Sequence, residues 1–352
     1  MSTSTLRRSA GLFAQLATVL ALAVGLAVPA AARMVVDSSG RHVEVPDAVH
    51  RVFAAGPPAA VLLYVVAPKT LVGWPRAPRA DDLPFLLPGV RDQPELGRLT
   101  GRGDTINTER LMASHPDIII DFGTLDDTYR SLADRIQAQT GIPYLLIDGR
   151  FGNTPAALRL LGDILGVSDR AETLARAAET AFAQVDQVLA KVPATERPRI
   201  YLARGIDGLE TGSRGSINTE ILERVGGVNV VEGVRDAGGI AKVSPEQVIT
   251  WAPDTIVTID PKLVELLRQR PEWRPVPAVA ERRIFLVPQR PFGSIDYPPS
   301  VNRLIGLPIL LHLLYPQRVT SDVHAEVRTF YRLFYQVDVS NDVIDDLLGA
   351  GR

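Results

Sequence analysis

The chain carries one pattern twice, as NTERLMASHPDIII at residues 107–120 and as SPEQVITWAPDTIV at residues 244–257. Each copy opens with a residue that caps helices, Asn107 or Ser244, and has a glutamate two positions later. A short amphipathic stretch then runs into Pro-Asp and an apolar strand pattern, with an offset of 137 residues throughout. A helix–strand unit repeated at this separation predicts two lobes of similar build.

Around these two copies, short apolar runs alternate with longer stretches of helical period, which is the α/β pattern. Several of the runs are continuous and rich in β-branched residues, as buried parallel strands are. The expected strands are Val52–Ala55, Thr70–Gly73, Ile118–Phe122, Tyr144–Ile147, Ile200–Ala203, Thr255–Ile259 and Ile284–Val287.

The middle of the chain has a different composition. From Pro155 to Val192 it contains mostly helix formers, with apolar residues at helical spacing, and a Pro-rich segment closes it at residues 193–198. We expect Asp169 to cap a long second helix that runs to about Lys191. About 20 residues at 1.5 Å each would span roughly 30 Å. The sequence therefore predicts a single long α-helix joining the lobes, although an ordinary helix covering a sheet fits the same pattern.

The N-terminus follows the grammar of a secretory signal peptide. Arg7 and Arg8 precede an apolar run from Ala10 to Val28, and Pro29 leads into three alanines ending at Ala32. We expect cleavage before Arg33, with a membrane-spanning helix as the alternative and Sec or twin-arginine export left open. The predicted division is a signal peptide at 1–32, an N-terminal α/β lobe at 33–154, connecting helices at 155–197, and a C-terminal α/β lobe with C-terminal helices at 198–352.

Composition excludes several functions. The chain has no cysteine, which excludes disulfides, thiolate chemistry and a lipid anchor on an N-terminal cysteine. Without Arg7 and Arg8 the chain has 36 basic and 40 acidic residues, which argues against nucleic acid as a partner. The five histidines do not cluster, so we expect no metal site. No nucleophile elbow or phosphate-binding glycine motif occurs, so we expect no catalytic residues, no enzyme activity and no cofactor.

The chain resembles the periplasmic binding proteins of ABC importers for iron–siderophore complexes, haem and vitamin B12. The resemblance is carried by the two glutamate-containing segments, by TGSRGSINTEILE at 211–223 with GGVNVV at 226–231, and by PPSVNRLIGL at 298–307. It covers roughly Arg51 to Pro316. It implies two Rossmann-like lobes joined by one long helix, with the ligand cleft between them. It also implies a periplasmic monomer that delivers its ligand to a permease and, through it, to an ATPase.

Two sets of residues follow as candidates. The resemblance implies that Glu109 and Glu246, one per lobe, dock with arginines of the permease. Each could instead only stabilise a helix N-terminus. Ligands of open α/β sheets bind beyond the carboxyl ends of the strands, and the segments there are rich in arginine and aromatic residues. The candidate ligand-binding residues are Gly56, Pro57, Trp74, Arg76, Arg204, Arg214, Arg290 and Tyr297.

The chemistry of these candidates favours an anionic ligand. Arginine offers planar, bidentate donors and stacks on aromatic rings, which suits a flat ferric chelate of the siderophore type. Molybdate or tungstate, haem, cobalamin and a nickel chelate remain alternatives. A receptor that signals to a membrane sensor, or an exported hydrolase, would be a function of a different class.

Overall fold

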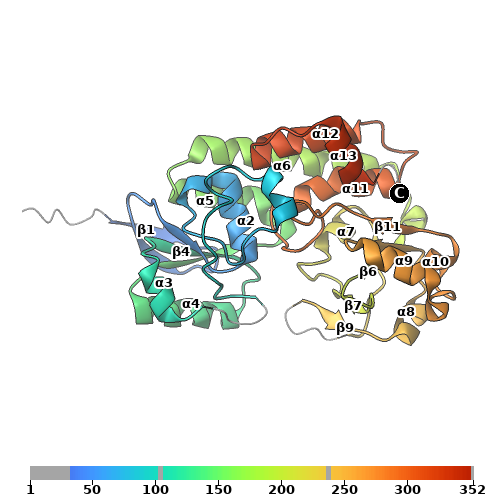
Figure 1. Cartoon of the computed structure of the whole chain (residues 1–352), viewed down its shortest axis with the longest axis horizontal. Coiled ribbons are helices and arrows are strands. Elements are labelled where there is room, and N and C mark those ends of the chain that lie inside the picture. The colour runs from blue at the N-terminus through green and yellow to red at the C-terminus, as the bar shows by residue number, and fades with distance from the viewer. Residues whose placement is uncertain (1–31, 102–105, 235–238, 350–352) are drawn as a thin grey trace, which may run out of the picture.

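The computed structural model describes residues 32–101, 106–234 and 239–349. These residues form two α/β lobes that lie side by side, with long helices running along one side of both (Figure 1). The predicted signal peptide lies outside the described residues, apart from Ala32. Within the described ranges, no helix is long and apolar enough to cross a membrane.

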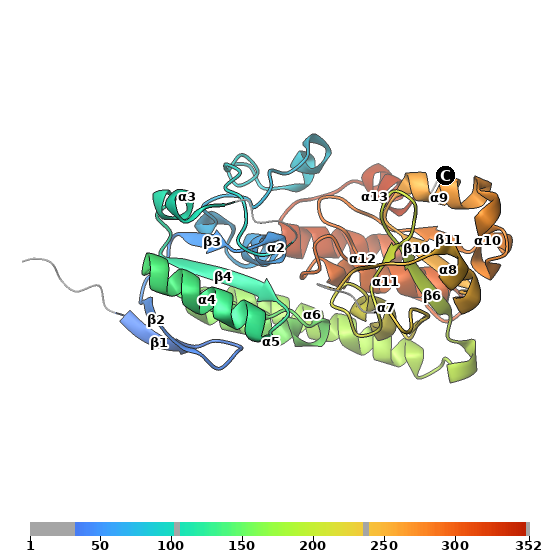
Figure 2. The ribbon, with the colours of Figure 1, turned by 90° about the horizontal axis from the view of Figure 1, so that it is seen from below.

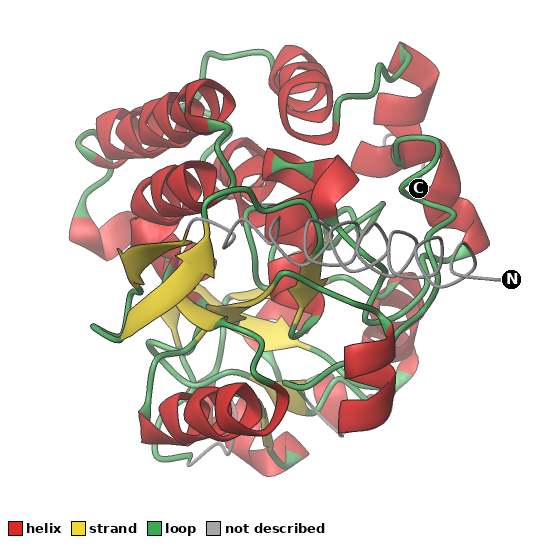
Figure 3. Cartoon of the chain, turned by 90° about the vertical axis from the view of Figure 1, so that its left-hand side faces the viewer, coloured by secondary structure: helices red, strands yellow, loops and turns green. Residues whose placement is uncertain are grey.

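The N-terminal lobe is built on a parallel sheet of three strands in the order β3-β4-β5, namely Val52–Ala54, Ile118–Gly123 and Tyr144–Asp148. Successive side chains of β4 pack into different hydrophobic cores, one on each face of the sheet. Ile118 and Ile120 pack with α2 (Pro57–Val66), whereas Ile119 packs with α4 (Asp127–Thr140). Helices therefore cover both faces of the sheet (Figure 3), which explains why its strands are apolar at every position.

The C-terminal lobe repeats this plan. Its parallel strands follow the order β11-β10-β6-β8, with bounds Ile284–Leu286, Thr255–Thr258, Arg199–Ala203 and Val228–Asn229. Its helices are α7 (Glu220–Arg224), α8 (Pro245–Trp251), α9 (Pro261–Gln269) and α10 (Pro277–Ala280).

The sequence repeat is confirmed in atomic detail. The short helices α3 (Thr108–Ala113) and α8 are capped by the side chains of Asn107 and Ser244. Both are followed by a residue in the left-handed conformation, His115 with φ 46° and Ala252 with φ 43°.

The aspartate after each proline then fixes the neighbouring strand. Asp117 accepts hydrogen bonds from the backbone N–H groups of His50 and Arg51, and Asp254 accepts one from Arg199. Pro-Asp in both copies is thus a fixed helix-to-strand junction.

The predicted connector is α6, a helix of 22 residues at Ser168–Leu189, preceded by α5 at Thr154–Ile164. At 1.5 Å per residue α6 is about 33 Å long, and it runs beneath both lobes in Figure 2. The expected cap was wrong by two residues. Val167 occupies the N-cap position without a side-chain bond, and Asp169 lies inside the first turn.

The C-terminal segment returns from the second lobe to the first. It comprises α11 (Arg303–Leu314), α12 (Val323–Phe330), the π-helical turn η6 (Tyr331–Tyr335) and α13 (Asn341–Leu348). The hydroxyl of Tyr64 in α2 donates to the carbonyl of Tyr335 at 2.9 Å. Arg170 of α6 donates to the carbonyls of Val65 and Leu333. One hydrophobic core runs continuously through both lobes and these helices.

Two features differ from the predicted strands. Thr70–Gly73 is not a strand, because the 3₁₀ helix η1 (Pro68–Thr70) takes up its start and only Leu71 bridges to Val52. Two antiparallel pairs were not predicted: β1 (Ala32–Val36) with β2 (His42–Pro46), and β7 (Glu210–Thr211) with β9 (Ala241–Lys242). The remaining elements are short 3₁₀ helices: η2 (Ala80–Phe85), η3 (Phe151–Asn153), η4 (Ala194–Glu196) and η5 (Pro271–Trp273).

Candidate ligand site at the boundary of the lobes

The segment between β11 and α11, residues 287–302, contacts both lobes. Its Gln289 donates to the carbonyl of Ile259, just after β10 of its own lobe. Its Ser300 hydroxyl donates to the carbonyl of Pro58, which follows β3 of the other lobe, at 2.7 Å. The carboxyl ends of strands from both sheets therefore meet at this segment. That is the position where open α/β sheets bind ligands.

Arg303, at the start of α11, closes the boundary. Its side chain is fully buried and donates to the carbonyl of Gly149, after β5, at 2.8 Å. It also donates to the carbonyl of Ile217 at 2.8 Å and to Glu220 at 3.2 Å. Glu220 in turn accepts the N–H of Phe151 in the N-terminal lobe. Burial lowers the pKa of Arg303 to about 10, against the opposing influence of Glu220, so this guanidinium stays charged at neutral pH.

Arg204, the first residue after β6, is the cation best placed for a ligand. Its side chain is 14% exposed and lies 3.2 Å from the carboxylate of Asp296, which is 1% exposed. Its guanidinium lies 5.9 Å from the centre of the Tyr297 ring. Tyr297 is 56% exposed. The structure thus brings together two of the predicted ligand residues, Arg204 and Tyr297.

Arg79 of the N-terminal lobe is paired with Asp82 at 2.9 Å. A hydrogen bond and the charge of Asp82 raise the pKa of Arg79, against the opposing influence of burial. Its side chain is exposed.

Three further candidates belong to the N-terminal lobe. Gly56 precedes α2, and a Cβ there would lie 2.6 Å from the hydroxyl of Thr100, so the site requires glycine. Pro57 is the half-buried first residue of α2. Trp74 is buried, donates its indole N–H to the carbonyl of Val90, and packs near Tyr64. Its ring is part of the core of the lobe in this structure.

The three other arginines are placed differently. Arg76 is exposed. Arg214 forms an ion pair with Glu232 at 2.9 Å, and Arg290 forms one with Asp346 of α13. No contact joins these three side chains to Arg204 within the described parts of the chain.

The predicted docking residues Glu109 and Glu246 are both exposed, each in the first turn of its helix. A hydrogen bond with Ser244 holds the pKa of Glu246 below its usual value, so this carboxylate is ionised at neutral pH.

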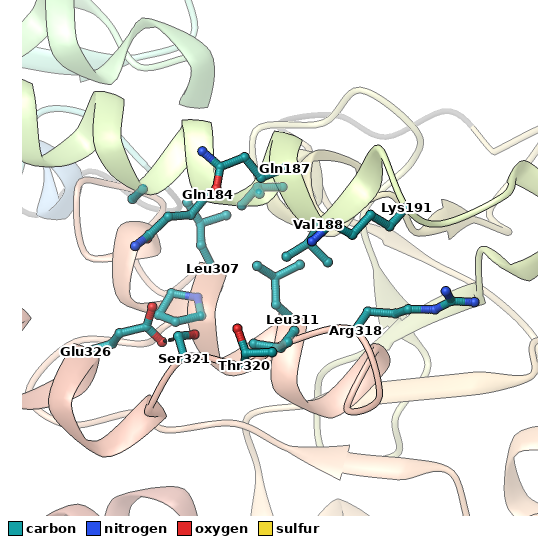
Figure 4. A pocket seen from close by; sticks show the side chains of 14 residues that line it. Gln184, Gln187, Val188, Lys191, Leu307, Leu311, Arg318, Thr320, Ser321 and Glu326 are labelled. Atoms are coloured by element: carbon teal, nitrogen blue, oxygen red, sulfur yellow. Dashed lines mark hydrogen bonds between the residues drawn. The ribbon is translucent and has the colours of Figure 1, made fainter.

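A pocket of about 190 Å³ lies elsewhere, between α6, α11 and residues 318–326 (Figure 4). Leu307 and Leu311 form its apolar side, while Gln184, Lys191 and Arg318 are among its polar residues. None of its lining residues follows a strand, so it is distinct from the lobe boundary. Among the described residues, no three histidine or acidic side chains are grouped so that they could hold a metal ion.

The sequence reasoning missed Asp296 and the Arg303–Glu220 pair. One signal was available for Arg303, since an arginine within the apolar run 301–311 needs a buried partner. Asp296 directly precedes the predicted residue Tyr297 in the sequence, but only the fold places its carboxylate 3.2 Å from Arg204.

Two α/β lobes on a helical connector, with strand ends and unlike charges at their boundary, define a bilobal solute-binding protein. The periplasmic binding protein family matches residues 48–291, more than half of the chain, and the chain belongs to this family.

Solved structures agree with this assignment. An ABC transporter solute-binding protein from Sulfurospirillum deleyianum is 29% identical, with a TM-score of 0.82 over 90% of this chain and 99% of that one. Molybdate-bound MolA of Haemophilus influenzae is 22% identical, with a TM-score of 0.73 over 88% and 99%. A protein of an Fe³⁺-hydroxamate transport system from Saccharomonospora viridis is 18% identical, with a TM-score of 0.58 over 80% and 99%. The latter two are likenesses of fold alone.

Proposed function

We propose that this periplasmic solute-binding protein captures an anionic ferric chelate of the siderophore type and delivers it to the permease of an ABC importer. One observation carries the proposal. Arg204 lies at the carboxyl end of β6, and its guanidinium lies beside the exposed ring of Tyr297. A cation and an aromatic ring can hold an anionic chelate by charge-assisted hydrogen bonds and stacking.

A tetrahedral oxyanion is the second candidate, and the position of Trp74 favours it. Trp74 is buried, and among the described residues Tyr297 is the one aromatic residue whose side chain is largely exposed. A large chelate would be suited by several exposed aromatic rings, whereas this site offers one.

The test is calorimetric titration of the purified protein with two probes, an anionic ferric catecholate chelate and sodium molybdate. We expect the ferric chelate to bind. Arg204→Ala should weaken its binding by about 1–3 kcal/mol, the usual cost of leaving a charged partner unpaired. Arg332→Ala is the matched control, since Arg332 is an exposed residue of η6 and pairs with Asp338. Tight binding of molybdate with no binding of the chelate would overturn the ferric assignment.

We also propose that Glu109 and Glu246 dock on basic residues of the permease, one from each lobe. Two matched, exposed carboxylates would make a bivalent contact, so the loss of either weakens the whole attachment. Glu109→Arg and Glu246→Arg should leave ligand affinity unchanged but depress uptake by cells, and the double variant should be worse because like charges then face each other. If uptake survives the double reversal, the two glutamates serve only their helices.

A further inference from the structure

Asp296 differs from the other buried acids of the protein in its hydrogen bonding. Its side chain is 1% exposed, yet neither carboxylate oxygen accepts an aligned hydrogen bond within the described residues. By contrast, Asp37 accepts from the backbone of Ser39 and Arg41, and Asp121 accepts from Thr100 and Tyr144. A buried carboxylate without hydrogen-bond donors is held by charge alone.

The opposite charges that face Asp296 come from two elements. Arg204, at the end of β6, approaches to 3.2 Å but does not align an N–H with the carboxylate. Arg303 of α11 acts from a greater distance and is already paired with Glu220 of α7. Tyr297, the neighbour of Asp296 in the chain, has its ring beside Arg204. Asp296 is therefore the direct counter-ion of Arg204.

Arg204 in turn has donor capacity to spare. Its buried Nη1 makes no hydrogen bond to any described residue. Arg303, by comparison, uses three nitrogens on four acceptors. An anion arriving at Arg204 can thus gain hydrogen bonds that Asp296 does not take.

The arriving anion would place a second negative charge near Asp296, which disfavours the ionised carboxylate. Desolvation already raises the pKa of Asp296 to about 6, and Arg204 and Arg303 only partly offset it. A further upward shift would raise the pKa of Asp296 above about 7, so that its carboxyl group is protonated at neutral pH.

We propose that Asp296 is the resident counter-ion of Arg204 and that the protein takes up one proton with each anionic ligand. The proton comes from solvent and converts the carboxylate of Asp296 to the neutral acid, while the anion replaces its charge beside Arg204. Ligand affinity then rises as the pH falls. This inference rests on the proposed binding of an anion at Arg204, and it does not depend on whether that anion is a chelate or an oxyanion.

The test is calorimetric titration of the intact protein with sodium molybdate and, in parallel, with an anionic ferric catecholate chelate. Each titration is repeated at pH 7 in buffers of different ionisation enthalpy, which gives the number of protons taken up. We expect uptake of about 0.5–1 proton per ligand, and an affinity that falls by up to about tenfold per pH unit above pH 7. The probe that binds gives the number of protons taken up. The two titrations also show whether the bound anion is an oxyanion or a chelate.

Two variants separate this inference from a general effect of pH. Asp296→Asn imitates the neutral acid, so its affinity at pH 8 should be at least about tenfold tighter and its proton uptake close to zero. Asp121→Asn is the matched control, because Asp121 is also a buried acid with a pKa raised to about 6 but has no contact with Arg204 among the described residues. It should keep the proton uptake of the unmodified protein.

The outcomes distinguish the two proposals. If neither probe binds, or if binding does not depend on Arg204, the proposed function itself is wrong. If a probe binds through Arg204 without proton uptake, or if Asp296→Asn retains the uptake, the counter-ion proposal is overturned and the binding function stands. The proton count of the unmodified protein decides the matter even if the Asn variant fails to fold.

Discussion

Replacing Arg303 by methionine should destabilise the whole protein, not one lobe. Methionine keeps most of the side-chain volume but removes the charge and every donor. The loss comprises a charge-assisted bond to Glu220, worth about 1.5–3 kcal/mol, and bonds to the carbonyls of Gly149 and Ile217, worth about 1 kcal/mol each. The sum of roughly 3.5–5 kcal/mol agrees with the usual cost of breaking a buried ion pair.

Urea unfolding followed by circular dichroism measures this cost. A single transition is expected for the unmodified protein, since one core is continuous through both lobes. Glu220→Gln should cost less than Arg303→Met, because glutamine still accepts the N–H of Phe151.

Arg332→Met is the control, as its pair with Asp338 is exposed and should contribute no more than about 0.5 kcal/mol. If Arg303→Met costs less than about 1 kcal/mol, or no more than the control, the guanidinium does not hold the lobes together.

Two further predictions concern motion and pH. Because α6 and the hydrogen bonds of Arg303 join the two lobes, we expect little closure when the ligand binds. The radius of gyration of about 20 Å, measured by small-angle scattering, should change by less than about 1 Å. A larger decrease would contradict a rigid boundary between the lobes. Burial raises the pKa of Asp121 to about 6, so its stabilising contribution is complete below about pH 4 and is lost as the pH rises through 6. The stability of Asp121→Asn relative to the unmodified protein, measured by urea unfolding, should therefore increase by about 2–3 kcal/mol between pH 4 and pH 7, and an unchanged difference would count against the raised pKa.

The α/β fold could be predicted because its signals are local. The apolar runs at residues 118–122 and 144–147 have the length of buried strands and are too short for helices. The Pro-Asp repeat marks a helix-to-strand junction that lies entirely within each lobe. The antiparallel pair of β1 and β2 escaped prediction because its residues alternate over only five positions, too few to stand out.

The candidate site could be predicted only in part, because its partners are distant in sequence. The loop position of Arg204 followed from the end of a strand, but its pairing with Asp296 joins residues more than 90 positions apart. Trp74 shows the opposite limit. An aromatic residue after an apolar run suggests a binding surface, while its burial depends on Tyr64 and on Phe292 from the other end of the chain.

The return of the C-terminal helices to the first lobe also bears on the order in which the protein can fold. The helix α2 is complete by residue 66, yet its Tyr64 bonds to Tyr335 and lies near Phe292. Contacts of such long sequence separation form late, since the loop between Tyr64 and Tyr335 spans 271 positions. The first lobe therefore cannot finish its own core until the end of the chain is present. In a polypeptide shortened at its C-terminus, we expect the part of α2 around Tyr64 to be exposed to solvent.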